Sequence, residues 1–321
     1  MNLLGNLDCE AGWAGVALPG AVLTRISLYA TLFSACAPAD EPGERHAIWL
    51  PAPIDPARLI AHPGWQPPAV QALGGGPRPA IDLAWADPAA SAANDRSRTL
   101  AIADAIGVAL PGACVVASLA ELEDQVGRLA GRPWICKARW TAAGRDRARG
   151  VGPTIAGELR VRIARMFERF GPLVFEPWLD RTADFGICGE ITAGGPVRVR
   201  EPHRLISDAR GGFLGIELAS PDSVDRGIAA ELCSVAEAAA RLVAERTGYR
   251  GPFAIDAFAY RAGSAHRLHP LCELNARFSF GWIARALARQ LGTRRLGFDA
   301  PPSGATVLIA PAADRVTAWC A

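Results

Sequence analysis

The sequence predicts a mixed fold, an α/β unit followed by an α+β unit, on three observations. The 321 residues are enough for about two domains, and half of them are apolar. Near the N-terminus, the apolar runs at 47–54 and 80–87 are typical of buried parallel strands, with loops rich in Pro and Gly between them. The last third alternates in hydrophobicity as strands do, around one long helix expected at about 222–247.

Capping residues mark where several helices begin and end. Asn94 or Asp95 can cap a helix that ends at Gly107, and Ser118 with Glu121 forms a capping box for the next one. Further helices are expected at 24–36, 155–169 and from 279. Strands are expected at 113–116, 134–138, 173–179, 182–193, 196–206, 252–261 and 267–277, and a polar glycine-containing loop at 141–150.

The cationic residues exclude several classes of enzyme. Of 34 Lys and Arg residues only Lys137 is a lysine, and it precedes Ala138 rather than the Ser or Thr of a P-loop. Protein kinases and S-x-x-K hydrolases need a lysine in other contexts, and a Schiff-base enzyme could use only Lys137. The formal net charge of +2 gives no reason to expect a nucleic-acid partner.

The cysteines and the N-terminal residues indicate a cytoplasmic protein. None of the eight cysteines forms a C-x-x-C pair, and most lie in apolar runs, as Cys136, Cys188 and Cys272 do. Free buried thiols suit a reducing compartment. The first residues lack the basic region of a signal peptide, and no run of 18 apolar residues exists, so no membrane span is expected.

Two late strands carry a candidate metal site. Glu273 and Asn275 are two residues apart, so they share one face of their strand. If the strands at 252–261 and 267–277 form an antiparallel hairpin, Asp256 can reach the same place. Two carboxylates and an amide oxygen suit Mg²⁺ that bridges nucleotide phosphates. The alternative, solvated strand faces, is disfavoured because Asp256 lies in an apolar strand, where an unpartnered carboxylate is costly.

Two further segments indicate a nucleotide site. Lys137 ends a strand just before the polar glycine loop, where its ammonium could contact a phosphate; the alternative is a surface lysine with a buried stem. In FEPWLDRTAD, Glu176 could accept a hydrogen bond from the adenine amine, and Asp184 could bind the ribose hydroxyls. Each of these signals is weak when taken alone.

In this order and spacing, the segments resemble the ATP-grasp superfamily of carboxylate–amine ligases. The resemblance covers about 94–292, and its strongest motif is FAIDAF followed by CELNAR. It implies an ATP-grasp fold with an N-terminal pre-grasp α/β domain at 1–93, a small central lid domain at 94–179 and a C-terminal α+β catalytic domain at 180–321. It also implies ATP and Mg²⁺ as cofactors, with two metal ions, and Mn²⁺ as an alternative metal.

The resemblance assigns roles to individual residues. Lys137 contacts the α- and β-phosphates, and the loop around Gly144 and Arg145 closes on the phosphates. Adenine is held by Glu176, Trp178 and Leu179, the ribose by Asp184, and the metal by Asp256, Glu273 and Asn275. Arg277 contacts phosphate or the acyl-phosphate region. One position departs from the family pattern: Arg96 stands where a phosphate-contacting lysine is usual.

The implied reaction is the joining of a carboxylate, activated as an acyl phosphate, to an amine. Both substrates are small molecules: an amino acid, a small peptide or a cofactor precursor. Arg200 and Arg204 could hold the carboxylate, and His203 could deprotonate the amine, unless their strand is simply a solvated edge. A phosphotransferase and a non-catalytic nucleotide-binding protein are the alternatives. The sequence does not indicate an oligomeric state, but members of the family are often dimers, so the resemblance leaves a homodimer open.

Overall fold

The structure is a computed structural model that describes residues 2–5, 7–37, 46–72, 88–141, 146–194, 196–208, 211–218 and 224–321. The strand predicted at 80–87 lies outside the described residues. So do Gly144 and Arg145 of the predicted phosphate loop. All eight cysteines are described and all are free, as predicted.

The N-terminal part forms a three-stranded parallel sheet, which confirms the predicted parallel arrangement. The strand predicted at 47–54 ends at Leu50, because Pro51 and Pro53 follow and cannot donate to a sheet ladder. The predicted helix at 24–36 is an α-helix that tightens into a 3₁₀ helix. The elements are β1 (Asn2–Leu4), α1 (Cys9–Trp13), α2 (Gly20–Ala30), the 3₁₀ helix Thr31–Cys36, β2 (Ala47–Leu50), the 3₁₀ helix Pro56–Arg58 and β3 (Ala69–Ala72).

A four-stranded antiparallel sheet with two helices forms the central part. Its strands β4 (Cys114–Val116), β5 (Trp134–Lys137), β6 (Arg147–Gly150) and β7 (Leu173–Pro177) lie in the order β4-β7-β5-β6, with α5 (Leu119–Arg128) and α6 (Gly157–Phe170) packed on them. Ser118 caps α5 as predicted. The loop predicted at 141–150 is partly wrong, because β6 occupies its end. Gly150 lets β6 approach the buried ring of Trp134, since a Cβ there would lie 2.2 Å from it.

The C-terminal part contains a nine-stranded sheet. Along it the strands run β13-β12-β8-β10-β11-β14-β16-β15, and β9 pairs with β8. The hairpin predicted from 252–261 and 267–277 is confirmed as β12 and β13. The strands are β8 (Asp180–Ile191), β9 (Val197–Val199), β10 (His203–Ser207), β11 (Phe213–Leu218), β12 (Gly251–Ala262), β13 (Ala265–Asn275), β14 (Arg295–Gly297), β15 (Thr306–Ile309) and β16 (Ala318–Cys320).

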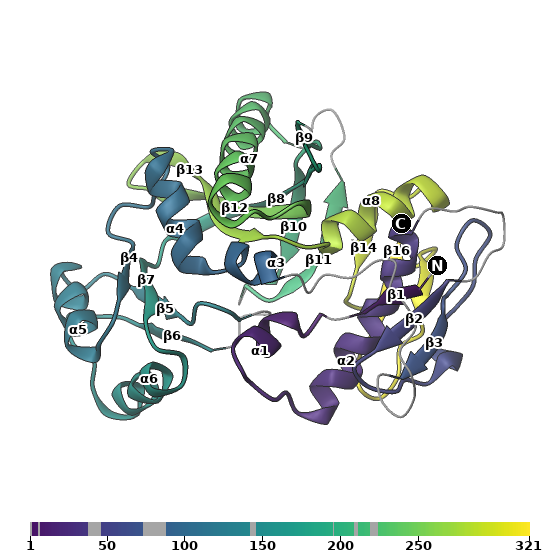
Figure 1. Cartoon of the computed structure of the whole chain (residues 1–321), viewed down its shortest axis with the longest axis horizontal. Helices are drawn as coiled ribbons and strands as arrows, with labels where there is room; N and C mark the ends of the chain where they lie inside the picture. Colours follow the sequence, from purple (N-terminus) through teal and green to yellow (C-terminus); the bar gives the residue numbers. More distant parts are fainter. Residues whose placement is uncertain are drawn as a thin grey trace.

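Helices α3 (Pro88–Ala93), α4 (Arg96–Ala105) and α7 (Arg226–Thr247) cover one face of this large sheet (Figure 1). Asp95 caps α4 by accepting a hydrogen bond from Ser97, and Gly107, with φ +73°, follows its end, as predicted. Ile102 of α4 is buried in the same core cluster as Leu232 of α7. Thus α4 precedes the central sheet in sequence but packs with the C-terminal part.

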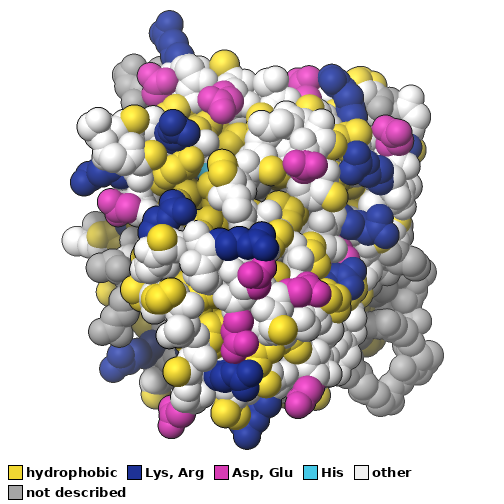
Figure 2. Space-filling view, turned by 90° about the vertical axis from the view of Figure 1, so that its left-hand side faces the viewer, with side chains coloured by type: hydrophobic (Ala, Val, Ile, Leu, Met, Phe, Trp, Pro, Cys, Tyr) yellow, Lys and Arg dark blue, Asp and Glu magenta, His cyan; other side chains and the backbone are white. Residues whose placement is uncertain are grey.

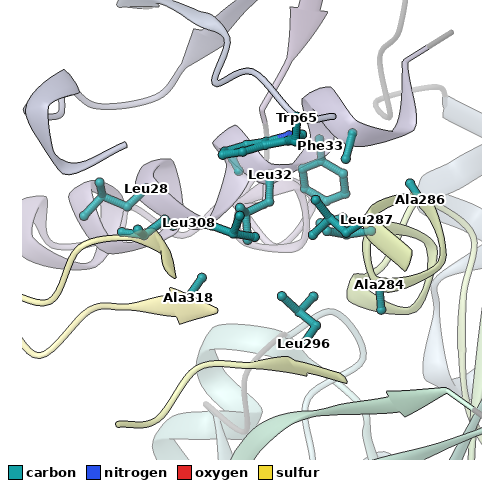
Figure 3. Packing of buried hydrophobic residues seen from close by; sticks show 14 of the residues in the cluster. Leu28, Leu32, Phe33, Trp65, Ala284, Ala286, Leu287, Leu296, Leu308 and Ala318 are labelled. Atoms are coloured by element: carbon teal, nitrogen blue, oxygen red, sulfur yellow. The ribbon is translucent and has the colours of Figure 1, made fainter. Parts of the chain in front are cut away.

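The N-terminal part and the last strands share one hydrophobic core. Leu28, Leu32 and Phe33 pack in the same cluster as Leu287 of α8 (Phe280–Leu291) and Leu296 of β14 (Figure 3). This cluster fixes α2 beside the edge of the large sheet, and the central sheet lies at the other end of the molecule (Figure 1). Among the described helices, none combines the length and the apolar character that a membrane crossing needs.

Candidate active site

A large cleft of about 2340 Å³ lies among the three parts of the structure. Its described lining contains twelve Arg or Lys residues but only six Asp or Glu residues, whereas the whole chain has a net charge of only +2. On the outer face shown in Figure 2, the two signs of charge are interspersed. The cleft therefore concentrates positive charge and suits an anionic ligand. Its lining includes Arg96, Lys137, Trp178, Leu179, Asp184, His203, Arg204, Asp256, Glu273, Asn275 and Arg277.

Lys137 lies at the end of β5 and forms an ion pair with Glu176 of β7. The distance from Lys137 Nζ to Glu176 Oε2 is 2.6 Å, and the side chains are only 13% and 14% exposed. Burial has the largest single effect and would lower the pKa of Lys137, but the charge and hydrogen bond of Glu176, together with Cys272, raise that pKa above its usual value. Burial likewise opposes the charge of Glu176, yet the lysine lowers its pKa. Both groups are therefore charged at neutral pH.

This ion pair differs from the adenine contact predicted for Glu176. Its carboxylate binds Lys137, and the described residues that line the cleft do not include Glu176. The cause is the register of the sheet: Ile135 lies opposite Glu176, so Lys137, two residues further on, is its diagonal neighbour on the same face. Glu176 thus holds the lysine in place at the wall of the cleft.

Asp256, Glu273 and Asn275 come together as predicted. Asp256 lies directly opposite Glu273 in the β12–β13 hairpin, and Asn275 is two residues further along the same face. Burial raises the pKa of Asp256 to about 7, and the negative charge of Glu273 adds to the effect, against the nearby Arg277 and Arg181. Two carboxylates this close favour a cation between them, and the all-oxygen set fits Mg²⁺.

Arg96 connects the candidate metal site to the central sheet. Its guanidinium donates to Glu273 Oε1 at 2.6 Å, to the Ala138 carbonyl at 3.0 Å and to Thr141 Oγ1 at 2.9 Å. A planar fork with several donors can make these bonds at once, which a lysine ammonium on its single stem cannot do in the same geometry. The phosphate contact predicted for Arg96 is therefore replaced, in this structure, by bonds within the protein.

Arg277 is paired with Glu10 of α1, a residue that the sequence analysis did not identify. The Glu10 side chain accepts from Arg277, which also donates to Asn275 Oδ1 at 3.2 Å. Burial alone would lower the pKa of Arg277, but Glu10 reverses the direction and raises it. No motif surrounds Glu10 in the sequence. Glu10 is one of two acidic residues in this N-terminal segment, with Asp8, and nothing in the sequence distinguishes it.

Replacing Glu10 by alanine is expected to destabilise the protein by about 3–5 kcal/mol, because it leaves the Arg277 guanidinium buried without its carboxylate partner. Glu10 itself is only 5% exposed. Urea unfolding of the two proteins measures the difference. Glu231→Ala, at an exposed position of α7, is the control and should change stability by less than about 0.5 kcal/mol. An equally small change in Glu10→Ala would contradict the prediction.

Arginine side chains surround the segment predicted to bind the nucleoside. The Arg149 guanidinium carbon lies 3.7 Å from the centre of a Trp178 ring, and Arg181 donates to Asp184 Oδ1 at 3.2 Å. The Trp178 main-chain N–H donates to the Pro133 carbonyl at 2.9 Å, which extends the pairing of β5 and β7. Leu179 follows directly and lines the cleft beside them.

His203 and Arg204 are adjacent on β10 and so point to opposite faces of the sheet. His203 is 2% exposed, and its ring fills the space beside Gly186 and Gly281, where a Cβ would lie 2.4 Å and 2.7 Å from it. Burial, together with Arg285, lowers the pKa of His203 to about 3. Such a weak base does not suit the deprotonation of an amine, so the role predicted for His203 is corrected. Arg204 lies opposite Glu217.

Comparison with known proteins identifies the fold but no relative in sequence. Neither the family models nor the curated proteins match the chain. Among solved structures, an ADP complex of the N5-carboxyaminoimidazole ribonucleotide synthetase PurK has a TM-score of 0.54, with 11% identity over 99% of this chain and 91% of that chain. The ADP-bound N5-carboxyaminoimidazole synthetase from Staphylococcus aureus has a TM-score of 0.50, with 12% identity over 87% and 70% of the two chains.

A third similar structure is that of a different enzyme. The biotin carboxylase from Campylobacter jejuni, in a β-γ-ATP complex, has a TM-score of 0.51, with 16% identity over 72% of this chain and 58% of that chain. At such low identity the likeness concerns the fold, and it agrees with the order of motifs in the sequence. The chain has the ATP-grasp fold.

Proposed function

We propose that this protein is an ATP- and Mg²⁺-dependent ligase that joins a carboxylate to an amine through an acyl phosphate. The observation that carries the proposal is that Lys137, the carboxylates Asp256 and Glu273, and Arg277 line a single positively charged cleft in an ATP-grasp fold. Two of the structural neighbours named above are complexes with ADP and the third is a β-γ-ATP complex, which supports ATP as the nucleotide.

The nucleotide lies between the central sheet and the large sheet in this proposal. Lys137, oriented by Glu176, contacts the phosphates, and Leu179 and Trp178 lie along the base. Asp184 faces the ribose. When the nucleotide binds, the Asp184 carboxylate accepts hydrogen bonds from the ribose hydroxyls, either in place of its bond from Arg181 or in addition to it. Asp256, Glu273 and Asn275 hold Mg²⁺, which when bound neutralises phosphate charge.

The reaction has two steps. A carboxylate oxygen of the first substrate attacks the γ-phosphorus, the bond to the bridging oxygen of ADP breaks, and ADP leaves. The amine nitrogen of the second substrate then attacks the acyl carbon, inorganic phosphate leaves, and the amine gives up a proton. The protein mainly positions the reactants and neutralises their charge, which Lys137 and Arg277 do as fixed cations. Arg204, at the wall of the cleft, is available to a substrate carboxylate.

The wider setting follows from the same assignment. In this proposal residues 1–93 form the pre-grasp domain, 94–179 the lid and 180–321 the catalytic domain, although α3 and α4 pack in the core of the catalytic domain. The substrates are small molecules, an amino acid, a small peptide or a cofactor precursor. The protein works in the cytoplasm, and we propose that it forms a homodimer. A Mn²⁺ ion can replace Mg²⁺ at an all-oxygen site of this kind.

The test is a panel of carboxylates assayed for ADP release, each with and without a panel of amines, with products identified by mass spectrometry. Release of ADP and phosphate that depends on an amine, together with an amide product, is the expected result. A stable phosphorylated product formed without any amine would instead identify a phosphotransferase. Failure of the protein to bind Mg²⁺–ATP in calorimetry would contradict every assignment above.

A further inference from the structure

Four aromatic side chains from four separate elements meet at one end of the cleft: Tyr29 of α2, Phe213 of β11, Phe280 of α8 and Phe298, which follows β14. We call them the aromatic patch. The ring centres of Phe280 and Phe298 are 4.7 Å apart. Phe213 lies 5.9 Å and 5.6 Å from these two rings, and Tyr29 lies 6.1 Å and 5.1 Å from them. All four residues line the cleft.

The patch is open to the cleft on one side and fixed on the other. Phe213 is 41% exposed, and the other three rings are half-buried. Beneath them lies the hydrophobic cluster of Figure 3, to which Leu28 of α2 and Leu296 of β14 belong. Aromatic rings that are held rigidly and partly exposed in a concave site give a ligand apolar contact at little cost in ordering.

Cationic side chains border the patch. Arg25 lies one helical turn before Tyr29 on α2, and Arg315 also lines the cleft. Neither arginine forms an ion pair with another described residue, whereas the nearby Asp314 is already bound by Arg58 at 3.1 Å. A ligand on the patch therefore meets rings on one side and guanidinium groups at its edge, which suits a molecule with both an aromatic ring and an anionic group.

The position of the patch in the sheet indicates which substrate it serves. Between β12, with Asp256, and β11, with Phe213, lie two strands, β8 and β10. At the usual strand spacing the two strands are about 14 Å apart across the sheet. Phe213 is further away than this, because the residue of β11 in the row of Asp256 is Leu218, at the other end of that strand. The carboxylate that is phosphorylated must lie against the γ-phosphate near Asp256, so the patch is placed for the other substrate. The cleft, at about 2340 Å³, has room for both beside a nucleotide, since a ligand pocket is typically about 300–1,000 Å³.

We infer that the amine substrate carries an aromatic ring, which stacks on Phe213 and its neighbours, and an anionic group, which binds Arg25 or Arg315. This inference rests on the ligase function proposed above and narrows it. Aromatic amino acids have this combination of groups. Aliphatic amino acids lack the ring, and phenethylamine lacks the anionic group.

The experiment measures binding by calorimetry without nucleotide, so that its outcome does not depend on turnover. The probes are L-phenylalanine, L-tyrosine and L-tryptophan, compared with L-alanine for the ring and with phenethylamine for the carboxylate. At least one aromatic amino acid is expected to bind about tenfold or more tightly than L-alanine, as the burial of a ring predicts. It should also bind more tightly than phenethylamine.

Variants link that preference to the patch. Phe213→Ala is expected to weaken binding of the aromatic amino acid about three- to tenfold, the range for the loss of one aromatic contact. Arg25→Gln together with Arg315→Gln should remove the preference over phenethylamine. Val115→Ala is the matched control, because Val115 is 43% exposed on the central sheet and does not line the cleft.

Two results would overturn the inference: no aromatic amino acid binds better than L-alanine, or Phe213→Ala binds as the unchanged protein does. The patch would then be packing between α2 and the sheet. Aromatic binding with no ADP release from any pair of substrates would instead leave the aromatic binding site standing, and would contradict the ligase function and with it the role of the bound molecule as the amine substrate. The two failures are therefore distinguishable.

Discussion

Replacing Lys137 by methionine is expected to lower kcat/KM for ATP by about 10²–10³-fold, the loss seen when one preorganised electrostatic contact to a reacting group is removed. Lys137 is the only lysine of the chain, and its ammonium lies at the wall of the cleft. Methionine keeps the length of the side chain and removes the charge, so steady-state ADP release measures the electrostatic contribution.

The same substitution also leaves Glu176 without its partner, and this effect must be separated from the first. A largely buried carboxylate that loses its cation destabilises a protein by about 3–5 kcal/mol. The double variant Lys137→Met with Glu176→Gln removes both charges, so it should recover most of the stability but none of the activity. If the double variant regained activity, Lys137 would be structural rather than a phosphate contact.

Lys137→Arg extends this test to the geometry of the cation. The Lys137 ammonium and the Glu176 carboxylate are 2.6 Å apart in a nearly enclosed space. A guanidinium is larger and planar, and its N–H groups point in other directions than those of an ammonium. We expect this variant to keep the charge and lose most of the turnover. Activity near that of the unchanged protein would show that charge alone matters at this position.

Replacing Glu273 by alanine is expected to lower turnover by at least about 10²-fold, because a catalytic metal contributes several kcal/mol to the transition state. Glu273 and Asp256 are the two carboxylates of the candidate metal site, so the loss of one should remove Mg²⁺ binding. Calorimetry of ATP with and without Mg²⁺ measures this directly. In Glu273→Ala the two titrations should become alike.

Arg96→Gln is the control for Glu273, since these two side chains bind each other at 2.6 Å. If Glu273 acts by holding Mg²⁺, Arg96→Gln should retain Mg²⁺-dependent nucleotide binding even when its stability falls. If Glu273 serves only as the partner of Arg96, both variants should show the same loss of stability and the same nucleotide affinity. Equal behaviour of the two variants would therefore contradict the metal assignment.

Local sequence patterns determined most of the secondary structure and the hairpin that carries the candidate metal site. The side-chain oxygens of Ser118 and Asp95 accept hydrogen bonds from main-chain N–H groups and so cap their helices. In CELNAR, the alternation of side chains along a strand places Glu273 and Asn275 on the same face, whatever the position of that strand in the sheet. Asp256 joins them because a short turn permits only antiparallel pairing of its strand with theirs. These features depend on local patterns and on one short turn between two consecutive strands, so the sequence alone was sufficient.

Only the tertiary structure decided what the charged side chains bind. Glu176 pairs with Lys137 because of the register between β5 and β7, and His203 is buried because two distant glycines leave room for its ring. Glu10 reaches Arg277 only because the N-terminal part packs against the C-terminal core. Such contacts depend on how sheets and helices pack across the whole chain, and packing in turn depends on side-chain volumes summed over many elements. The sequence therefore determined the chemistry that the cleft contains, and the packing decided which groups hold one another in place.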